Sequence, residues 1–206
     1  VPEETALTLR DISRAFRRFG AGAQVRRRLD DGDEIPLARR RLRVAHVPGH
    51  SPTDTLFVDE ERRIAFAGDH LIARVSSNPV IHRPLSGPVD PARRAPALSA
   101  YLGSLRRSAE MDLDVILSGH GEPIRDHRAL VAERLRHHDD RKEQIAALVA
   151  ESPRTAHDIS RAIWGDVALR QAYLTLCEVL GHTDLLVAEG RIEERRRDGL
   201  LVFASR

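Results

Sequence analysis

The chain has 206 residues, of which 41% are hydrophobic and 31% are charged, enough for one ordinary domain and a second small one. The formal net charge is +2, and Lys142 is the only lysine, so arginine supplies nearly all of the positive charge. Composition therefore excludes a strongly basic or strongly acidic protein. The single cysteine, Cys177, excludes an internal disulfide and is expected to be a buried core thiol.

The chain opens with a predicted amphipathic helix followed by a β-rich stretch. The helix shows apolar residues at intervals of three and four: Leu9, Ile12, Phe16 and Phe19. We expect it to end near Gly20 or Gly22. Four short apolar segments are then predicted as strands, the last two forming a hairpin: residues 34–37, 41–47, 55–58 and 64–67. Their apolar character predicts a sheet that is covered on at least one face.

A long irregular segment is predicted over residues 73–96, which contain five prolines. Loops of this length inside compact domains are often functional lids or mouths. A helix over residues 97–109 and a strand over residues 113–117 are predicted to follow.

Beyond residue 125 the pattern becomes helical and ends in a hairpin. A long helix is predicted over residues 129–150, and a short one, residues 159–164, follows an N-cap at Thr155. A third helix is marked by Leu169, Tyr173, Leu176 and Leu180, and a terminal hairpin turns at residues 198–199. This order is typical of a winged-helix domain. We therefore predict two domains, residues 1–125 and 126–206.

Three potential metal ligands directly follow strand-like segments: His50, Asp69 and His120. Zinc prefers imidazole and carboxylate ligands, and rigid strand ends are suitable places to hold them. Each ligand has glycine neighbours, which allow sharp turns and close backbone approach to an ion: Gly49, Gly68, Gly119 and Gly121. The sequence therefore predicts a metal site built from these three side chains.

The segments that carry these ligands resemble those of the metallo-β-lactamase fold hydrolases, in the branch with a C-terminal winged-helix domain. The matching segments are residues 47–52, 66–71 and 117–123, in that order along the chain. Similarity continues through residues 141–145, 152–155 and 162–165. The resemblance implies an α/β fold, the later part of an αββα sandwich, followed by a small winged-helix domain.

The resemblance also implies roles for the three ligands. His50 would complete the shell of one metal ion, Asp69 would bridge two ions, and His120 would complete the shell of the second. Zn2+ is the implied metal, two ions per complete site. A metal-bound hydroxide would then attack an ester, thioester, lactone, amide or phosphodiester, since bound metal lowers the pKa of water to about 7.

The chain departs from the family pattern at one point. The family carries a His-x-His-x-Asp-His motif upstream of these segments, whereas His46 is the only histidine in residues 1–47. The catalytic aspartate of that motif has no counterpart, so no catalytic residue is assigned. The chain resembles the later part of such an enzyme, as a fragment, a truncated reading frame or a degenerate member. We expect it to bind one Zn2+ or none, to show little hydrolysis, and to expose apolar faces that favour a homo-oligomer.

The expected partner is a small molecule or an acyl thioester. Residues 126–206 contain 13 basic and 14 acidic residues, a net charge of −1, which disfavours nucleic acid as a partner. No apolar stretch approaches the roughly 18 residues of a membrane span, and residues 1–5 lack the features of a secretory signal. A cytoplasmic protein without a membrane partner is predicted. The alternative is a non-catalytic interaction or regulatory remnant whose winged helix binds a protein or nucleic acid.

The remaining histidines are given structural roles. His70 should point away from Asp69 in a packing or supporting role, and His46 should be structural. His82 and residues 76–79 are interpreted as a solvated loop. Three further histidines are placed on a solvated helix face: His127, His137 and His138.

Overall fold

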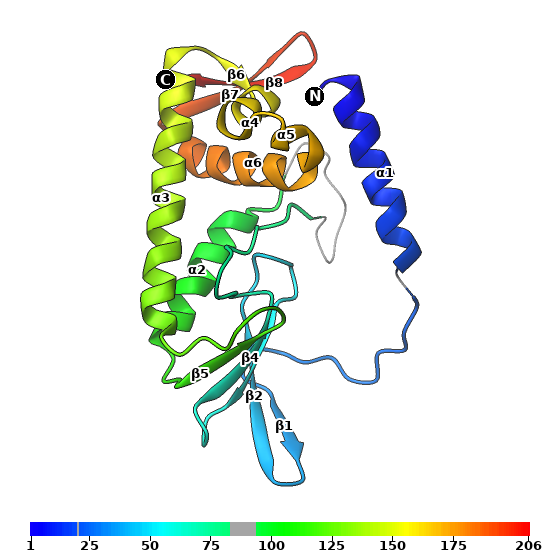
Figure 1. Ribbon diagram of the computed structural model, residues 1–206, viewed down its shortest axis with the longest axis vertical. Helices are drawn as coiled ribbons and strands as arrows, with labels where there is room; N and C mark the ends of the chain where they lie inside the picture. The colour runs from blue at the N-terminus through cyan, green and yellow to red at the C-terminus, as the bar shows by residue number, and fades with distance from the viewer. Residues whose placement is uncertain (20, 83–93) are drawn as a thin grey trace. The chain divides into compact units, whose positions relative to one another are not determined.

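The computed structural model, shown in Figure 1, describes residues 1–19, 21–82 and 94–206. The chain forms two compact units: Leu29–Asp140, and Val1–Arg28 together with Arg141–Arg206. The long helix α3 (His127–Glu151) runs through the boundary between them. The division at residues 125 and 126 stays a prediction. Within the described ranges, no helix combines the length and the apolar character that crossing a membrane requires.

The unit Leu29–Asp140 contains a five-stranded sheet with the order β1-β2-β3-β4-β5. Its strands are β1 (Glu34–Leu37), β2 (Arg40–His46), β3 (Thr55–Asp59), β4 (Ile64–Gly68) and β5 (Val115–Ser118). Neighbouring strands are antiparallel except β4 and β5, which are parallel. The predicted strands and the hairpin are confirmed, with β5 starting two residues later than expected. Part of the predicted irregular segment, residues 83–93, lies outside the described residues.

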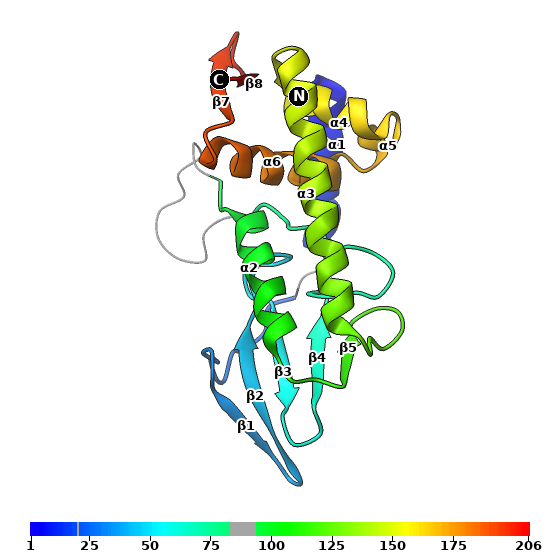
Figure 2. The same ribbon diagram turned by 90° about the vertical axis from the view of Figure 1, so that its left-hand side faces the viewer.

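One face of this sheet is covered by helices. Helix α2 (Ala97–Glu110) and the first part of α3 lie on the same side of the sheet in both views (Figures 1 and 2). The residues that face this side are fully or almost fully buried: Ala45, Leu56, Val58, Ala65 and Ile116. Along α2 the buried Leu98, Tyr101 and Leu105 recur at three and four residues, as one face of a helix requires.

The opposite face of the sheet carries an apolar row. Phe57 pairs with Phe66 across β3 and β4, and Phe66 pairs with Leu117 across β4 and β5. Phe66 is 38% exposed, and its two neighbours are half-buried. A large aromatic side chain open to solvent in such a row is a candidate contact for a second molecule, so self-association stays a prediction.

Replacement of Phe66 by serine tests this prediction. Burying a phenylalanine contributes about 1.5–3 kcal/mol, so the variant is expected to associate at least about 10-fold more weakly. Sedimentation equilibrium over a range of concentrations measures the change. A wild-type chain that stays monomeric throughout that range would contradict the prediction.

The second unit begins with α1 (Glu3–Phe19), which contacts α6 (Ala172–Ala188). The predicted first helix is confirmed, but it begins six residues before Leu9. Glu3 and Glu4 lie in its first turn, where negative charge stabilises a helix. The grouping of α1 with residues 141–206 was not predicted.

The helices that follow α3 agree with the sequence pattern in order. Thr155 caps α4 (Ala156–Trp164) through a capping box with Asp158, as expected. The predicted third helix is interrupted, because Gln171 leaves helical geometry between α5 (Val167–Arg170) and α6. Cys177 on α6 is buried, as predicted.

A three-stranded sheet with the order β6-β8-β7 completes this unit: β6 (Arg154–Thr155), β7 (Ile192–Arg197) and β8 (Leu200–Ser205). The predicted hairpin is confirmed. Asp198 and Gly199 at its turn both have positive φ, as a type I′ turn requires. The helices and the sheet share one buried apolar cluster: Ile145, Val149, Ile159, Val179, Leu186, Ile192 and Phe203.

Candidate metal centre

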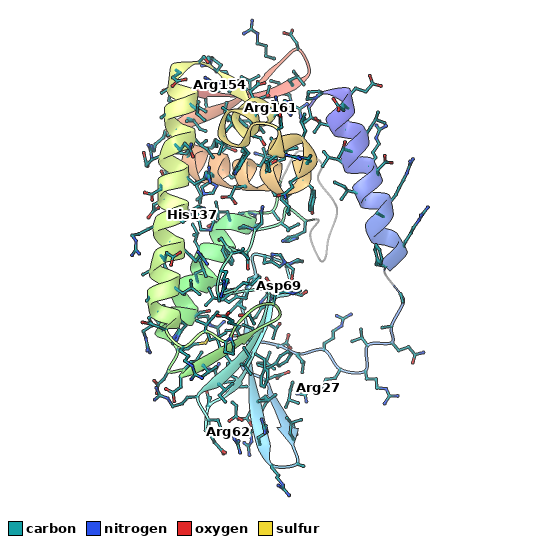
Figure 3. All side chains as sticks on the ribbon, in the orientation of Figure 1. Arg27, Arg62, Asp69, His137, Arg154 and Arg161 are labelled. Atoms are coloured by element: carbon teal, nitrogen blue, oxygen red, sulfur yellow. The ribbon has the colours of Figure 1, made fainter. Side chains whose placement is uncertain are left out.

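Three strands bring the predicted ligands to one edge of the sheet. β2 and β4 are both antiparallel to β3, and β5 is parallel to β4. The carboxyl ends of β2, β4 and β5 therefore lie at the same edge. Asp69 directly follows β4 (Figure 3), His120 lies two residues beyond β5, and His50 lies four residues beyond β2.

The carboxylate of Asp69 faces both imidazoles. Its Oδ2 lies 3.9 Å from Nε2 of His50, and its Oδ1 lies 3.6 Å from Nε2 of His120. These separations exceed those of N–H···O hydrogen bonds. Two ligands bound to one tetrahedral zinc ion at its usual bond lengths lie about 3.3 Å apart. The observed separations are slightly longer, and each carboxylate oxygen faces a different histidine.

The three side chains are accessible to different extents. The side chain of His120 is 76% exposed, whereas those of Asp69 and His50 are 37% and 30% exposed. A catalytic metal needs an open coordination position for water or substrate. The partial exposure of these three side chains meets that requirement.

A hydrogen bond fixes the orientation of the His50 ring. Nδ1 of His50 lies 2.9 Å from the backbone carbonyl oxygen of Asn78. Because a carbonyl oxygen only accepts hydrogen bonds, Nδ1 is the donor, and in the neutral form of the ring the lone pair is then on Nε2. That lone pair is on the nitrogen nearest Asp69, as a metal ligand requires.

Gly119 brings the turn that bears His120 close to Asp69. Its backbone N–H donates a 2.6 Å hydrogen bond to the carbonyl of Gly68. A Cβ atom at position 119 would lie 2.7 Å from Oδ1 of Asp69, closer than real Cβ contacts allow. The expected role of glycine in allowing close approach is supported here by the geometry of the turn.

The other histidines are placed only partly as predicted. His70 is fully buried, and its Nε2 lies 2.8 Å from Oγ of Ser108, consistent with a packing role. Burial lowers the pKa of His70 to about 4, so its ring is neutral at neutral pH. The expectation of a solvated helix face is wrong for His127 and His138, which are both buried, whereas His137 is exposed.

The loop after Asp69 makes hydrogen bonds that the sequence did not predict. Ser77 and Pro79 are buried, so the interpretation of residues 76–79 as a solvated loop is wrong for these two. Ser77 donates through Oγ to the carbonyl of Asp69, and Asn78 accepts from His50 through its own carbonyl. Both hydrogen bonds use backbone acceptors, which leave no signature in a sequence.

Comparison with known proteins identifies the family. Residues 3–120 match the model of the metallo-beta-lactamase superfamily. A curated relative named as a probable metallo-hydrolase of Bacillus subtilis is 34% identical over 149 residues, which cover 72% of this chain and 46% of the relative. A human acyl-coenzyme A thioesterase is 49% identical over 41 residues, 20% of this chain and 15% of that protein.

Solved structures match over most of the chain. A beta-lactamase domain protein from Burkholderia ambifaria has a TM-score of 0.79 and 28% identity, covering 94% of this chain and 59% of that one. A metallo-beta-lactamase family protein from Thermus thermophilus has a TM-score of 0.73 and 30% identity, covering 89% and 55%. The chain spans less than half the length of the Bacillus relative. The family match over residues 3–120 and the mixed α/β fold show that the chain belongs to the metallo-beta-lactamase superfamily.

Proposed function

We propose that the chain carries part of the metal centre of a metal-dependent hydrolase, with His50, Asp69 and His120 as ligands and zinc as the metal. The observation that supports this most is the Asp69 carboxylate, which presents one oxygen to each imidazole. One carboxylate facing two imidazoles suits a bridge between two cations. The side chains would then divide so that each ion receives one imidazole nitrogen and one carboxylate oxygen.

The chemistry of the donors fits zinc. Two imidazoles and a carboxylate are ligands that zinc accepts, and His50 is oriented through Nδ1 as zinc-binding histidines are. Zinc held there supplies Lewis-acid chemistry and lowers the pKa of a bound water to about 7. Asp69 would fix the spacing of the ions, and the exposed His120 would lie on the solvent side of the site.

The number of ligands limits what this chain does by itself. A catalytic zinc ion typically has three protein ligands, whereas three ligands divided between two ions leave each ion with two contacts. We therefore propose that this chain binds one zinc ion or none tightly and hydrolyses substrates slowly.

An acyl thioester is the substrate class that we propose. The human relative is named as an acyl-coenzyme A thioesterase, and residues 126–206 carry a net charge of −1, which is unsuited to a nucleic-acid partner. We propose a winged-helix-like domain for residues 126–206, supported by the element order α3, β6, α4, α5, α6, β7, β8. We also propose that residues 1–125 correspond to the later part of an αββα sandwich.

Zinc titration and removal test the proposal. Metal-free chain is titrated with zinc against a fluorescent chelator, and release of free thiol from an acyl-coenzyme A is followed with and without EDTA. We expect at most one tightly bound zinc per chain and slow thioester hydrolysis that EDTA abolishes. Hydrolysis that continues unchanged in EDTA, or faster cleavage of a phosphodiester than of the thioester, would contradict the proposal.

A further inference from the structure

The backbone that follows Asp69 is held by side chains instead of by regular secondary structure. β4 ends at Gly68, and residues 69–82 belong to no helix or strand. The carbonyl groups of residues 69–73 nevertheless all accept hydrogen bonds. Ser77 Oγ donates to the carbonyl of residue 69, the Tyr101 hydroxyl to that of residue 70, and Ser118 Oγ to that of residue 71. Nη2 of Arg134 donates to the carbonyls of residues 72 and 73. We call residues 69–73 the Asp69 turn.

Two of these donors come from the helices that cover the sheet. Tyr101 on α2 donates to the carbonyl of His70 at 3.1 Å. Arg134 on α3 donates to the carbonyls of Ile72 and Ala73 at 3.4 and 3.2 Å. The tyrosine is fully buried and the arginine is 8% exposed. Figure 2 shows α2 and the first part of α3 beside each other on one side of the sheet.

The chemistry of these donors suits a fixed turn. Burial raises the pKa of Tyr101 to about 12, so its hydroxyl keeps the proton that it donates. The guanidinium of Arg134 is planar and always charged, so its hydrogen bonds to carbonyls are directional and do not depend on pH. Nη1 of Arg134 also pairs with Glu133 at 2.9 Å. Burying a cation is costly even when it is paired, and an apolar side chain of similar length would fill the same space without that cost. Packing alone therefore does not account for an arginine at this position.

The position of a carboxylate ligand depends on the backbone that carries it. Metal ligands must lie within about 0.2 Å of their bonding distances, so a turn that shifts by more would separate the Asp69 oxygens from the two imidazoles. We propose that Tyr101 and Arg134 are positioning residues for the candidate metal centre, which hold the Asp69 turn so that its carboxylate faces both His50 and His120. This inference rests on the proposed function, because it concerns the same ligands.

The test compares zinc affinity and stability in matched variants of the full chain. Arg134→Met removes both hydrogen bonds to the turn and the pairing with Glu133 at similar volume. Arg134→Lys restores a cation, and Tyr101→Phe removes only the hydroxyl. Arg128→Met is the control for the arginine, because Arg128 lies on the same helix and donates to the carbonyls of Ala109 and Met111. Tyr173→Phe, at the only other tyrosine, is the control for the hydroxyl.

Zinc affinity of each folded variant is measured by competition with a fluorescent chelator, and unfolding is measured separately in EDTA. We expect Arg134→Met to bind zinc about 10- to 100-fold more weakly, the range for groups that orient metal ligands. Tyr101→Phe should be weakened to a smaller extent, and Arg134→Lys should recover part of the loss. Both controls should bind zinc as the wild type does.

The possible outcomes separate this inference from the proposed function. A wild-type chain with no measurable zinc affinity overturns the positioning role, whereas thioester hydrolysis that continues unchanged in EDTA overturns the proposed function. If the wild type binds zinc and the folded Arg134 and Tyr101 variants bind it equally well, the positioning role is wrong and the two residues serve stability alone. If Arg134→Met does not fold, Tyr101→Phe and Arg134→Lys decide, and unchanged affinity in both overturns the inference.

Discussion

Replacement of Asp69 by asparagine is expected to lower zinc affinity by more than about 100-fold, beyond the loss seen when a group that only orients a ligand is removed. The amide keeps the shape of the carboxylate but lacks its charge, and the amide nitrogen that replaces one oxygen does not bind a metal ion. Because both Asp69 oxygens face an imidazole, one substitution affects both halves of the proposed site. Equilibrium dialysis followed by elemental analysis measures the zinc that each chain retains.

Asp112→Asn is the matched control for this experiment. Asp112 is 71% exposed and pairs with Arg63 at 2.6 Å, away from the three proposed ligands. Its substitution removes the same charge and should leave zinc binding unchanged. Equal loss of zinc in both variants would point to net charge as the cause, and full retention in Asp69→Asn would exclude Asp69 as a ligand.

Replacement of Gly49 by alanine is expected to lower the free energy of unfolding by about 2–6 kcal/mol, the sum of backbone strain and overpacking. Gly49 has a φ of 151°, and a Cβ atom there would lie 2.4 Å from Cα and Cβ of Tyr101. Backbone atoms of a helix cannot yield as a flexible side chain would, and Tyr101 is fully buried. The loop that carries His50 would move away from α2, so zinc affinity should fall as well. Denaturant unfolding in EDTA measures the first effect.

Gly103→Ala provides the control, because it lies on α2 near Tyr101 and a Cβ there meets no atom within 4 Å. Alanine is the better helix former, so this variant should be more stable by about 0.5–1 kcal/mol. A Gly49→Ala chain as stable as the wild type would contradict the close approach of Gly49 to Tyr101.

The elements of the fold were largely readable from the sequence where the signal is local. The capping box at Thr155 and Asp158 and the turn at Asp198 and Gly199 depend on residues three or fewer positions apart, and both occur as predicted. The break at Gln171 was missed because neither glycine nor proline marks it. The grouping of α1 with the C-terminal residues depends on contacts between distant segments, which periodicity does not encode.

For the candidate site, the sequence indicated the proposed metal ligands but not the residues that hold them in position. A histidine or an aspartate between glycines at a strand end is a visible pattern, and the structure brings His50, Asp69 and His120 to one sheet edge. The partners that orient them act through backbone carbonyls. Arg134 was therefore indistinguishable from the other charges on α3, and Tyr101 from an ordinary core residue.

The most direct test of the proposed centre is anomalous diffraction at the zinc absorption edge from crystals of the chain grown with zinc. The proposal predicts an anomalous peak about 2.0–2.2 Å from an Asp69 carboxylate oxygen and at a similar distance from Nε2 of His50 or His120. A zinc ion bound elsewhere, with the Asp69 carboxylate and both imidazoles free of metal, would contradict it.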